Sequence, residues 1–389
     1  MISERDAAGA LPPRGWLRDY TEHAFQQTTA PLGYHLGVGL SVLAVTCPLN
    51  FGSRYAGSLR GNLYTLLVGR SGEDQKSTAL DVGRRVLFAA QPTLIGDHPG
   101  SWEGLIDSLA RRPSQIVVYS EFGKFLSAAQ KGYFEPLKAT MTDLWDCSPQ
   151  HRVKANGVAT RVDDPRLSIM AGCSVPYLER HTEPHDWSGG FMGRWLVLYS
   201  RRERVDPDPV GNDDAVPFLA AGLKARADIQ AAGDYGGLDA AARIMWDDWF
   251  YDLERRPVPD IIAGAKTRAP TLARKVAMLL SWDYGQAVTG APWQITVDEL
   301  EPAIRIAELH LKSVIGLSEK LAEHPDAQVR RSVLESIAPG GAATLGQILR
   351  STKLRRRTVT EILDALVLDG SLTRANLVGG DALFERVVR

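Results

Sequence analysis

A short apolar strand that runs into a glycine- and serine-bearing loop, and then into a lysine-led helix, constrains this chain most. Leu63–Val68 is an uninterrupted apolar run of the buried-strand type, and a helical pattern follows Lys76. The loop between them contains Gly69, Ser71 and Gly72, and glycine allows backbone conformations that other residues rarely adopt. Loop amides and a helix N-terminus attract phosphate oxygens, and a lysine at this place neutralises their charge. The segment therefore predicts a strand–loop–helix site for a nucleoside triphosphate.

The loop has the general pattern of a P-loop, and this pattern predicts roles for individual residues. We expect Lys76 to face the β- and γ-phosphates of ATP and Ser77 to ligate Mg²⁺. Gln75 stands where the usual pattern has a glycine, and the loop is one residue longer than usual. The alternative is a surface turn beside an ordinary lysine. The full set predicted to contact the nucleotide from this loop is Gly69, Ser71, Gly72, Lys76, Ser77 and Thr78.

The length, net charge and cysteine pattern of the chain limit its possible domain number and binding partners. Its 389 residues are enough for two or three domains. The formal net charge is -1, so any nucleic-acid contact must come from local basic patches. The three cysteines form no CxxC pair, which argues against a disulfide framework or a zinc site. No apolar run approaches the ~20 residues of a membrane span, and the N-terminus has no signal-peptide core. We expect a cytoplasmic protein with no membrane partner.

Apolar strands alternate with helical segments through the first half of the chain, which predicts an α/β fold with a parallel, helix-covered sheet. The expected strands are Leu63–Val68, Ile116–Tyr119, Leu167–Ala171 and Trp195–Tyr199. The predicted organisation is a helical N-terminal segment over 1–55, an ATPase core over 56–215, a helical lid over 216–323 and a terminal module over 326–389.

The terminal module shows three helical segments and then a hairpin, the pattern of a winged helix. The turn signal is Gly379-Gly380-Asp381. The third helix opens with four basic residues that suit contact with DNA phosphates, and the alternative is a protein-docking module with a solvated basic face. These residues are Lys353, Arg355, Arg356 and Arg357.

Polar residues follow two of the expected strands at the edge where open α/β sheets bind ligands. Glu121 follows Ile116–Tyr119 and suits the orientation of an attacking water, although a surface glutamate is the alternative. Ser120 occupies the place where a second carboxylate usually holds Mg²⁺ through a water. Ser174 ends the next strand and is the candidate sensor of the γ-phosphate, with Cys173 as the weaker candidate.

Three arginines are candidates for contact with a γ-phosphate. Arg194 directly precedes a strand and could reach the nucleotide of a neighbouring subunit as an arginine finger; a salt bridge flanking the core is the alternative. Arg268 and Arg274 lie at the start and middle of a lid helix, from which one of them is expected to reach the γ-phosphate. The sequence does not choose between these two.

Two further segments carry recognisable patterns. His151–Val162 contains two alternating strands around Asn156-Gly157, a hairpin signal. His181 and His185 have the spacing of a metal pair, but Pro184 between them disfavours the helix that would place both on one face.

The order of these motifs resembles the AAA+ ATPases of the pre-sensor-1 hairpin group. The nearest likeness is to minichromosome-maintenance (MCM) helicases and to MCM-like replication ATPases of phages and mobile elements. SEFGKF (Ser120–Phe125) is similar to that family's Asp-Glu-Phe-Asp-Lys segment. VKANGVATRVDDPRLSIMAG (Val153–Gly172) is similar to its Lys-Ala-Gly hairpin and sensor strand, and GGFMGRW (Gly189–Trp195) resembles its Ser-Arg-Phe finger. The likeness spans about Gly61 to Lys312.

The resemblance implies an AAA+ core with a helical lid and a C-terminal winged helix, assembled into a hexameric ring that hydrolyses ATP with Mg²⁺ between subunits. It also implies that Lys154 and Arg152, on the hairpin, grip DNA in a central channel. The expected function is an ATP-dependent DNA helicase or translocase in the replication of a phage or mobile element, with other replication proteins as further partners. Gln75 and Ser120 favour an alternative, a DNA-bound helicase loader with weak or no hydrolysis. A third possibility is a sequence-specific DNA-binding regulator with a degenerate ATPase.

Overall fold

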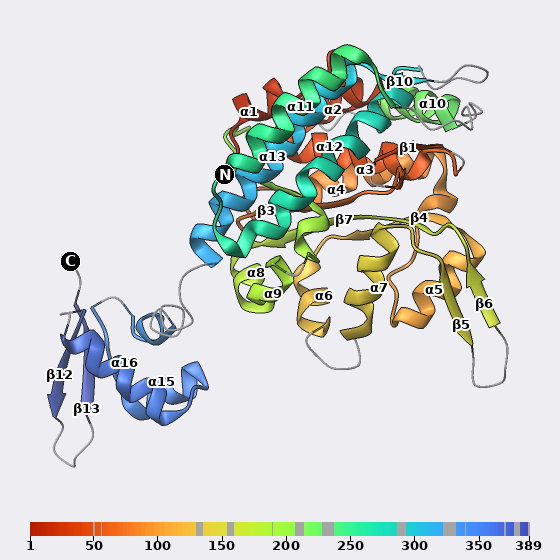
Figure 1. Ribbon diagram of the computed structural model, residues 1–389. Helices are drawn as coiled ribbons and strands as arrows, with labels where there is room; N and C mark the ends of the chain where they lie inside the picture. The colour runs from red at the N-terminus through yellow and green to blue at the C-terminus, as the bar shows by residue number, and fades with distance from the viewer. Residues whose placement is uncertain are drawn as a thin grey trace. The chain divides into compact units, whose positions relative to one another are not determined.

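The computed structural model of the chain forms two compact units, Met1–Ser318 and Glu319–Arg389, each described by itself here (Figure 1). The described residues are 1–49, 51–55, 57–129, 135–153, 159–188, 190–206, 214–227, 237–285, 293–321, 332–338, 340–368, 371–376 and 382–387. In this part of the chain, no helix has both the length and the apolar character needed to cross a bilayer.

The first unit is built on a four-stranded parallel sheet in the order β4-β7-β3-β8. Its strands are β3 (Tyr64–Gly69), β4 (Ser114–Tyr119), β7 (Arg166–Ser174) and β8 (Trp195–Tyr199), and they confirm the four expected strands and their parallel arrangement. Since the strands are parallel, their carboxyl ends share one edge of the sheet. Gly69 pairs with Ser174 at that edge, and Tyr64 pairs with Trp195 at the other.

Helices cover both faces of this sheet; Figure 1 shows α3 and α4 on one side and α6 and α7 on the other. The helices are α1 (Glu4–Gly9), α2 (Trp16–Gln27), α3 (Leu32–Thr46), α4 (Lys76–Ala90), α5 (Trp102–Arg111), α6 (Phe122–Ala129), α7 (Glu135–Trp145), α8 (Val175–His181), α9 (Pro184–Ser188), α10 (Val216–Ala227), α11 (Ala240–Arg255), α12 (Ala263–Asp283) and α13 (Val297–Leu321). The minor strands pair as β1 (Gly52–Arg54) with β2 (Ser58–Arg60), β5 (Gln150–Val153) with β6 (Ala159–Val162), and β9 (Gly237–Leu238) with β10 (Gln294–Ile295).

Helix α3 is the centre of the apolar core, because all of its residues are buried. It packs against the sheet on one side and against α2 and α4 on the others. Gly39 permits the close approach of α2, since a Cβ there would lie 2.6 Å from the ring of Tyr20. A helix enclosed in this way is part of the core rather than a small helical prefix. The predicted boundary at residue 55 therefore does not separate compact units.

The predicted lid also belongs to the first unit. At the end of α12, the buried Asp283 carboxylate accepts hydrogen bonds from the backbone N–H groups of Trp16 (2.9 Å) and Leu17 (3.0 Å). The guanidinium of Arg226 in α10 donates to the same carboxylate at 2.7 Å. Asp283 thus satisfies the first N–H groups of α2, which have no partner inside their own helix. The boundary predicted at residue 215 is likewise not a boundary between compact units.

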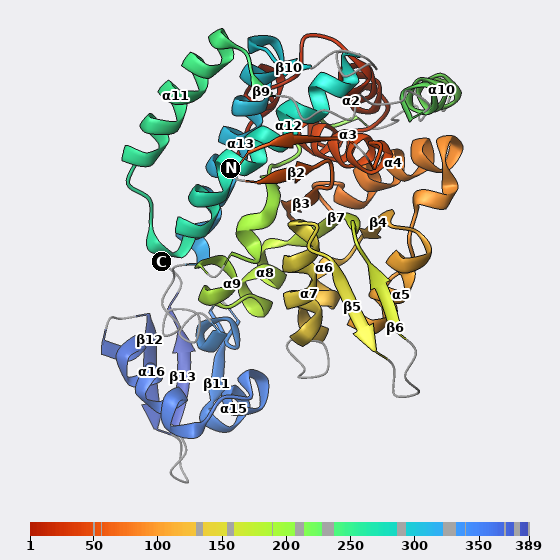
Figure 2. The same ribbon diagram turned by 45° about the vertical axis from the view of Figure 1, so that its right-hand side comes forward.

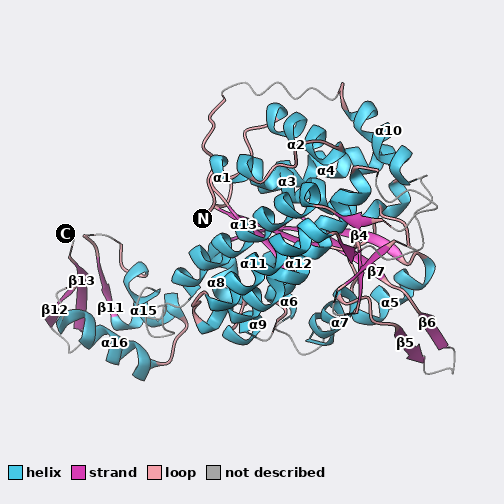
Figure 3. Cartoon of the chain, turned by 45° about the horizontal axis from the view of Figure 1, so that its top comes forward, coloured by secondary structure: helices cyan, strands magenta, loops and turns pink. Residues whose placement is uncertain are grey.

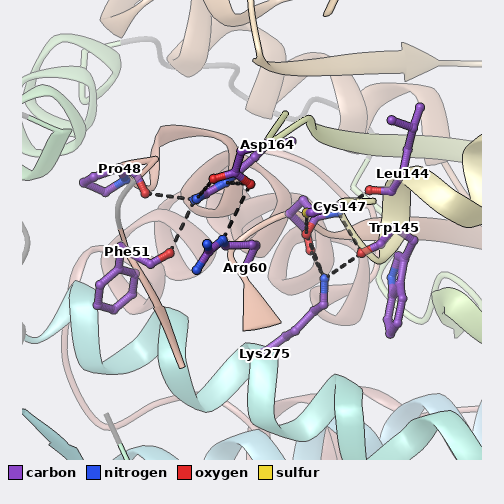
Figure 4. Close-up of polar contacts among 10 residues, drawn as sticks. Pro48, Phe51, Arg60, Leu144, Trp145, Cys147, Asp164 and Lys275 are labelled. Atoms are coloured by element: carbon purple, nitrogen blue, oxygen red, sulfur yellow. Dashed lines mark hydrogen bonds and ion pairs between the residues drawn. The ribbon is translucent and has the colours of Figure 1, made fainter. Parts of the chain in front are cut away.

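Buried cations fix the amino-terminal edge of the sheet (Figure 4). The ammonium of Lys275 in α12 donates to the carbonyl of Asn62 at 3.1 Å, to its side-chain oxygen at 2.7 Å and to the carbonyl of Trp145 at 3.1 Å. Burial lowers the pKa of Lys275 to about 8. Arg166, at the start of β7, donates to the carbonyls of Pro48 (3.0 Å) and Phe51 (3.3 Å). The Lys275 contacts thus join the lid helix to Asn62, two residues before β3.

The second unit has its own small apolar core under a three-stranded antiparallel sheet ordered β11-β13-β12. Its elements are β11 (Ala342–Thr344), α15 (Leu345–Thr352), α16 (Arg356–Leu368), β12 (Leu372–Asn376) and β13 (Ala382–Arg386). The antiparallel pairing of β12 with β13 confirms the expected hairpin strands. The turn predicted at Gly379-Gly380-Asp381 lies outside the described residues.

Candidate nucleotide site

The loop between β3 and α4 has the backbone form that a phosphate loop needs. Gly72 has a φ of +73°, and Gln75, directly before α4, has a φ of 49° and a ψ of 36°. Both are left-handed conformations, which glycine adopts without steric cost and which cost other residues roughly 1–2 kcal/mol. The departure at Gln75 therefore changes the side chain while keeping the conformation that the usual glycine serves.

A buried carboxylate holds this loop in shape. Asp74 is fully buried and accepts hydrogen bonds from the backbone N–H groups of Arg70 (2.6 Å) and Arg202 (3.0 Å). The Arg70 guanidinium forms an ion pair with it at 2.9 Å. Burial alone would raise the pKa of Asp74, but the hydrogen bonds from Arg70 and Arg202 outweigh it and hold the pKa below its usual range. Because Arg202 follows β8, Asp74 ties the loop to the neighbouring strand.

The base of the loop is held by Tyr34 of α3. Its hydroxyl lies 2.6 Å from the carbonyl oxygen of Val68 and 2.9 Å from that of Ser200. Gly69 fits beneath these groups only without a side chain, since a Cβ there would lie 2.8 Å from an Asp74 carboxylate oxygen. The sequence analysis missed Tyr34 and Asp74; the Arg70–Asp74 spacing inside a glycine-bearing loop was the available signal.

Lys76 begins α4 and folds back over the loop. Its ammonium donates to the carbonyl of Gly69 at 3.1 Å and to that of Arg70 at 2.7 Å. Burial lowers the pKa of Lys76 below its ordinary value. Carbonyl oxygens of the loop thus hold two of the three ammonium donors.

A cavity of 490 Å³ opens at this edge of the sheet. It brings together residues from the loop, the start of α4 and the carboxyl ends of β4 and β7. The lining residues are Ser71, Gly72, Gln75, Lys76, Ser77, Thr78, Ser120, Glu121, Gly123, Lys124, Gly172, Cys173, Ser174 and Tyr177. The predicted loop residues from Ser71 to Thr78, Glu121 and Ser174 therefore share one site. Gly69 pairs with Ser174 in the sheet but does not line the cavity.

Within the cavity, the acidic and sensor candidates differ in their surroundings. The Glu121 side chain is 62% exposed and forms an ion pair with Lys124, one turn later. Ser174 precedes α8, and its side chain makes no cap hydrogen bond to that helix. Burial raises the pKa of Cys173 to about 12, so its thiol stays neutral. The hydroxyl of Ser174 is thus the better placed polar group of the two.

Arg194 lies at the opposite edge of the sheet, just before β8. Its guanidinium forms an ion pair with Asp146 at 2.9 Å, donates to the carbonyl of Gly190 at 2.9 Å and lies 5.6 Å from the Trp145 ring centroid. This ion pair is the salt bridge that the sequence left open as the alternative. Arg194 does not line the cavity around the loop of its own chain.

The two lid arginines do not approach the loop either. Arg268 lies 5.8 Å from the Trp145 ring centroid, in the same cluster as Arg194. Arg274 is buried near the rings of Tyr55 (5.6 Å) and Trp246 (5.5 Å), and burial lowers its pKa to about 10. The expectation that one of them reaches a γ-phosphate stays a prediction, but neither arginine lines the cavity around the loop of its own chain. The reason is tertiary: α12 runs past the amino-terminal edge of the sheet, as its Lys275–Asn62 contact shows.

Not all of the residues expected to contact DNA lie within the described part of the chain. Figures 2 and 3 show β5 and β6 projecting from the body of the first unit. Arg152 in β5 forms an ion pair with Asp107 of α5 at 2.9 Å, and Lys154 lies outside the described residues. In the second unit, the four basic residues around the start of α16 are all exposed. Arg356 and Arg357 begin the helix, whereas Arg355 precedes it and Lys353 is the C-cap of α15.

The histidines and cysteines of the described residues form no cluster of metal ligands. No group of three or more histidine, cysteine or carboxylate side chains among them could hold a metal ion, the His181–His185 pair included. The three cysteines are free thiols.

Comparison with models of known protein families gives no match to the chain, and comparison with curated proteins gives none either.

Proposed function

We propose that this protein is an ATP-dependent DNA helicase or translocase of the MCM-like AAA+ type, acting in the replication of a phage or mobile element. The observation that carries the proposal is the shared cavity of Lys76, Ser77, Glu121 and Ser174 at the carboxyl edge of a parallel sheet. Open α/β sheets bind ligands at this edge, and a left-handed loop before a buried helix presents amides to phosphate.

Each residue of the cavity has its own role in the proposed hydrolysis of ATP. Lys76 neutralises the charge of the β- and γ-phosphates, and the amides around Gly72 and Gln75 bind the same oxygens. Ser77 and Ser120 supply hydroxyl oxygens of the kind that Mg²⁺ accepts beside its waters, and bound Mg²⁺ neutralises charge that develops on the phosphates. Glu121 orients the attacking water, for which it must leave Lys124.

The arginine cluster supports hydrolysis between subunits of a ring, hexameric in the proposal. Arg194 and Arg268 share the ring of Trp145 at the edge of the sheet opposite the loop. From there they cannot serve the nucleotide of their own chain, whereas a neighbouring copy could present its phosphates to them. The Arg194–Asp146 ion pair opens when this happens. DNA is held by the hairpin residues Arg152 and Lys154 and by the basic start of α16, in the proposed winged helix.

A second candidate is a DNA-bound helicase loader that uses ATP for assembly with little turnover. Two observations favour it: Ser120 offers no carboxylate to the metal, and Lys76 and Glu121 are each engaged by groups of their own chain. Processive strand separation by the purified protein alone would exclude this candidate.

The test is DNA-stimulated ATP hydrolysis by the full-length protein. We expect Lys76→Ala to abolish binding of a non-hydrolysable ATP analogue, and Glu121→Gln to retain that binding while hydrolysis falls at least about 100-fold. Lys224→Ala is the matched control, because Lys224 is exposed on α10 outside the cavity.

Hydrolysis that survives both Lys76→Ala and Glu121→Gln, or that does not respond to DNA, would contradict the helicase proposal. Analogue binding with Lys76 dependence but without hydrolysis would favour the loader.

A further inference from the structure

The proposed metal side of the site lacks the carboxylate that a second acidic residue after β4 would supply. Ser120 stands there and lines two neighbouring cavities, the one around the loop and another of 640 Å³. The second cavity also contains Ser77, so the two cavities meet at the proposed Mg²⁺ ligand. A carboxylate in the second cavity would therefore face the metal from the far side of Ser120.

An extended segment outside β4 delivers such a carboxylate. Ile95 forms a parallel bridge with Ile116, and the Gly96 N–H donates to the Ile116 carbonyl at 2.8 Å. Further along, the His98 ring nitrogen Nε2 lies 2.6 Å from the Val118 carbonyl oxygen, and the ring stacks on Tyr119 at 4.6 Å. The segment thus runs beside β4 in the same direction. In this register its Asp97 lies beside Val118, two residues before Ser120, and it lines the same cavity as both.

Two carboxylates line the second cavity, and only one has no charged partner in the described part of the chain. Asp81 of α4 forms ion pairs with Arg84 at 2.8 Å and with Arg85 at 3.3 Å. Asp97 is exposed, and no hydrogen bond or ion pair joins its side chain to another described residue. Ser77, Asp97 and Ser120 line this one cavity of 640 Å³. Asp97 is thus positioned to accept hydrogen bonds from a metal-bound water.

We propose that Asp97 takes the place of the acidic residue missing at Ser120 and holds a water of the Mg²⁺ shell that accompanies the nucleotide. The proposal rests on the nucleotide site proposed above. Mg²⁺ binds proteins through few carboxylates and keeps several waters, so a water-mediated contact from Asp97 suits it. Asp97 is a positioning residue in this arrangement, since it acts on the metal through water.

The experiment measures Mg²⁺ dependence rather than turnover. A non-hydrolysable ATP analogue is titrated into the full-length protein by calorimetry at a series of Mg²⁺ concentrations. We expect Asp97→Asn to raise the Mg²⁺ concentration for half-maximal binding by about 10-fold, the usual scale for loss of an outer-shell partner. Binding in the presence of EDTA should not change. Asp81→Asn, in the same cavity, is the matched control and should not shift the midpoint.

Ser120→Asp in the Asp97→Asn background should restore the wild-type midpoint, because it returns a carboxylate to the same metal face. A midpoint that is unchanged by Asp97→Asn, while Lys76→Ala still abolishes binding, overturns the role of Asp97 and leaves the nucleotide site standing. Failure of the wild-type protein to bind the analogue at any Mg²⁺ concentration overturns both proposals.

Discussion

At the scale of single residues, Gln75 shows how a motif can lose its usual side chain and keep its geometry. The position before α4 needs a left-handed backbone, and Gln75 adopts one with a φ of 49°. The surrounding loop imposes this conformation, because Asp74 and Lys76 on either side are both held by hydrogen bonds to the loop and its neighbours. The strain is local and can be removed by one substitution.

We expect Gln75→Gly to raise the free energy of unfolding by up to about 1 kcal/mol, because relief of the left-handed strain exceeds the added entropy of the unfolded chain. Chemical denaturation measures the change. Gln26→Gly is the control, since Gln26 is exposed within α2 and should lose about 1 kcal/mol instead. Equal losses in the two variants would show that position 75 is not strained.

At the scale of elements, ion pairs and hydrogen bonds hold the loop between β3 and α4 in one conformation. Arg70 forms ion pairs with two acids of the same loop, the buried Asp74 and the half-exposed Glu73. Only Asp74 also accepts backbone N–H groups, including that of Arg202 after β8. The two acids therefore provide a matched comparison between a buried and an exposed partner of one arginine.

We expect Asp74→Asn to lower the free energy of unfolding by about 1–3 kcal/mol, and Glu73→Gln to change it by less than about 1 kcal/mol. The pH dependence has a definite sign. The folded-state pKa of Asp74 lies below its ordinary value, so its stabilising contribution is present above about pH 4 and is lost as the pH falls through the lowered pKa. Urea unfolding of the three proteins between pH 7 and pH 3 measures this.

The difference between wild-type protein and Asp74→Asn should shrink in acid. A difference in the free energy of unfolding that stays constant with pH would mean that the Asp74 charge does not stabilise the loop.

The same scale shows where sequence reasoning succeeds and where it stops. Leu63–Val68 and Trp195–Tyr199 were recognisable as strands because uninterrupted apolar runs of that length fit a sheet buried on both faces. The meeting of Glu121 and Ser174 with the loop followed from the parallel arrangement of their strands. The path of α12 was not predictable, because its apolar pattern marks a buried face without saying which edge of the sheet it meets. The sequence therefore could not show that Arg268 lies beside the Trp145 ring.

At the scale of the whole molecule, the second unit is a separate compact body with its own apolar core and an exposed basic helix start. Replacing Lys353, Arg355, Arg356 and Arg357 with alanine should lower DNA affinity at least about 10-fold and flatten the dependence of affinity on salt. Thermal unfolding should barely change, because these side chains are exposed. Fluorescence anisotropy at several salt concentrations measures both effects.

The matched control removes the same number of charges from exposed helical positions of the first unit: Arg5, Lys224, Arg243 and Arg255. Equal losses of affinity in the two quadruple variants would assign DNA binding to overall charge and not to the start of α16.

The enclosure of α3 has a consequence for how the protein is made. Its apolar surface is buried against β7, which leaves the ribosome about 120 residues later, a delay on the order of 10 s at ordinary translation rates. During that interval α2, β3 and α4 can pack against α3, but the apolar face that meets β7 has no partner. Efficient production in cells should therefore depend on chaperones that shield emerging apolar segments.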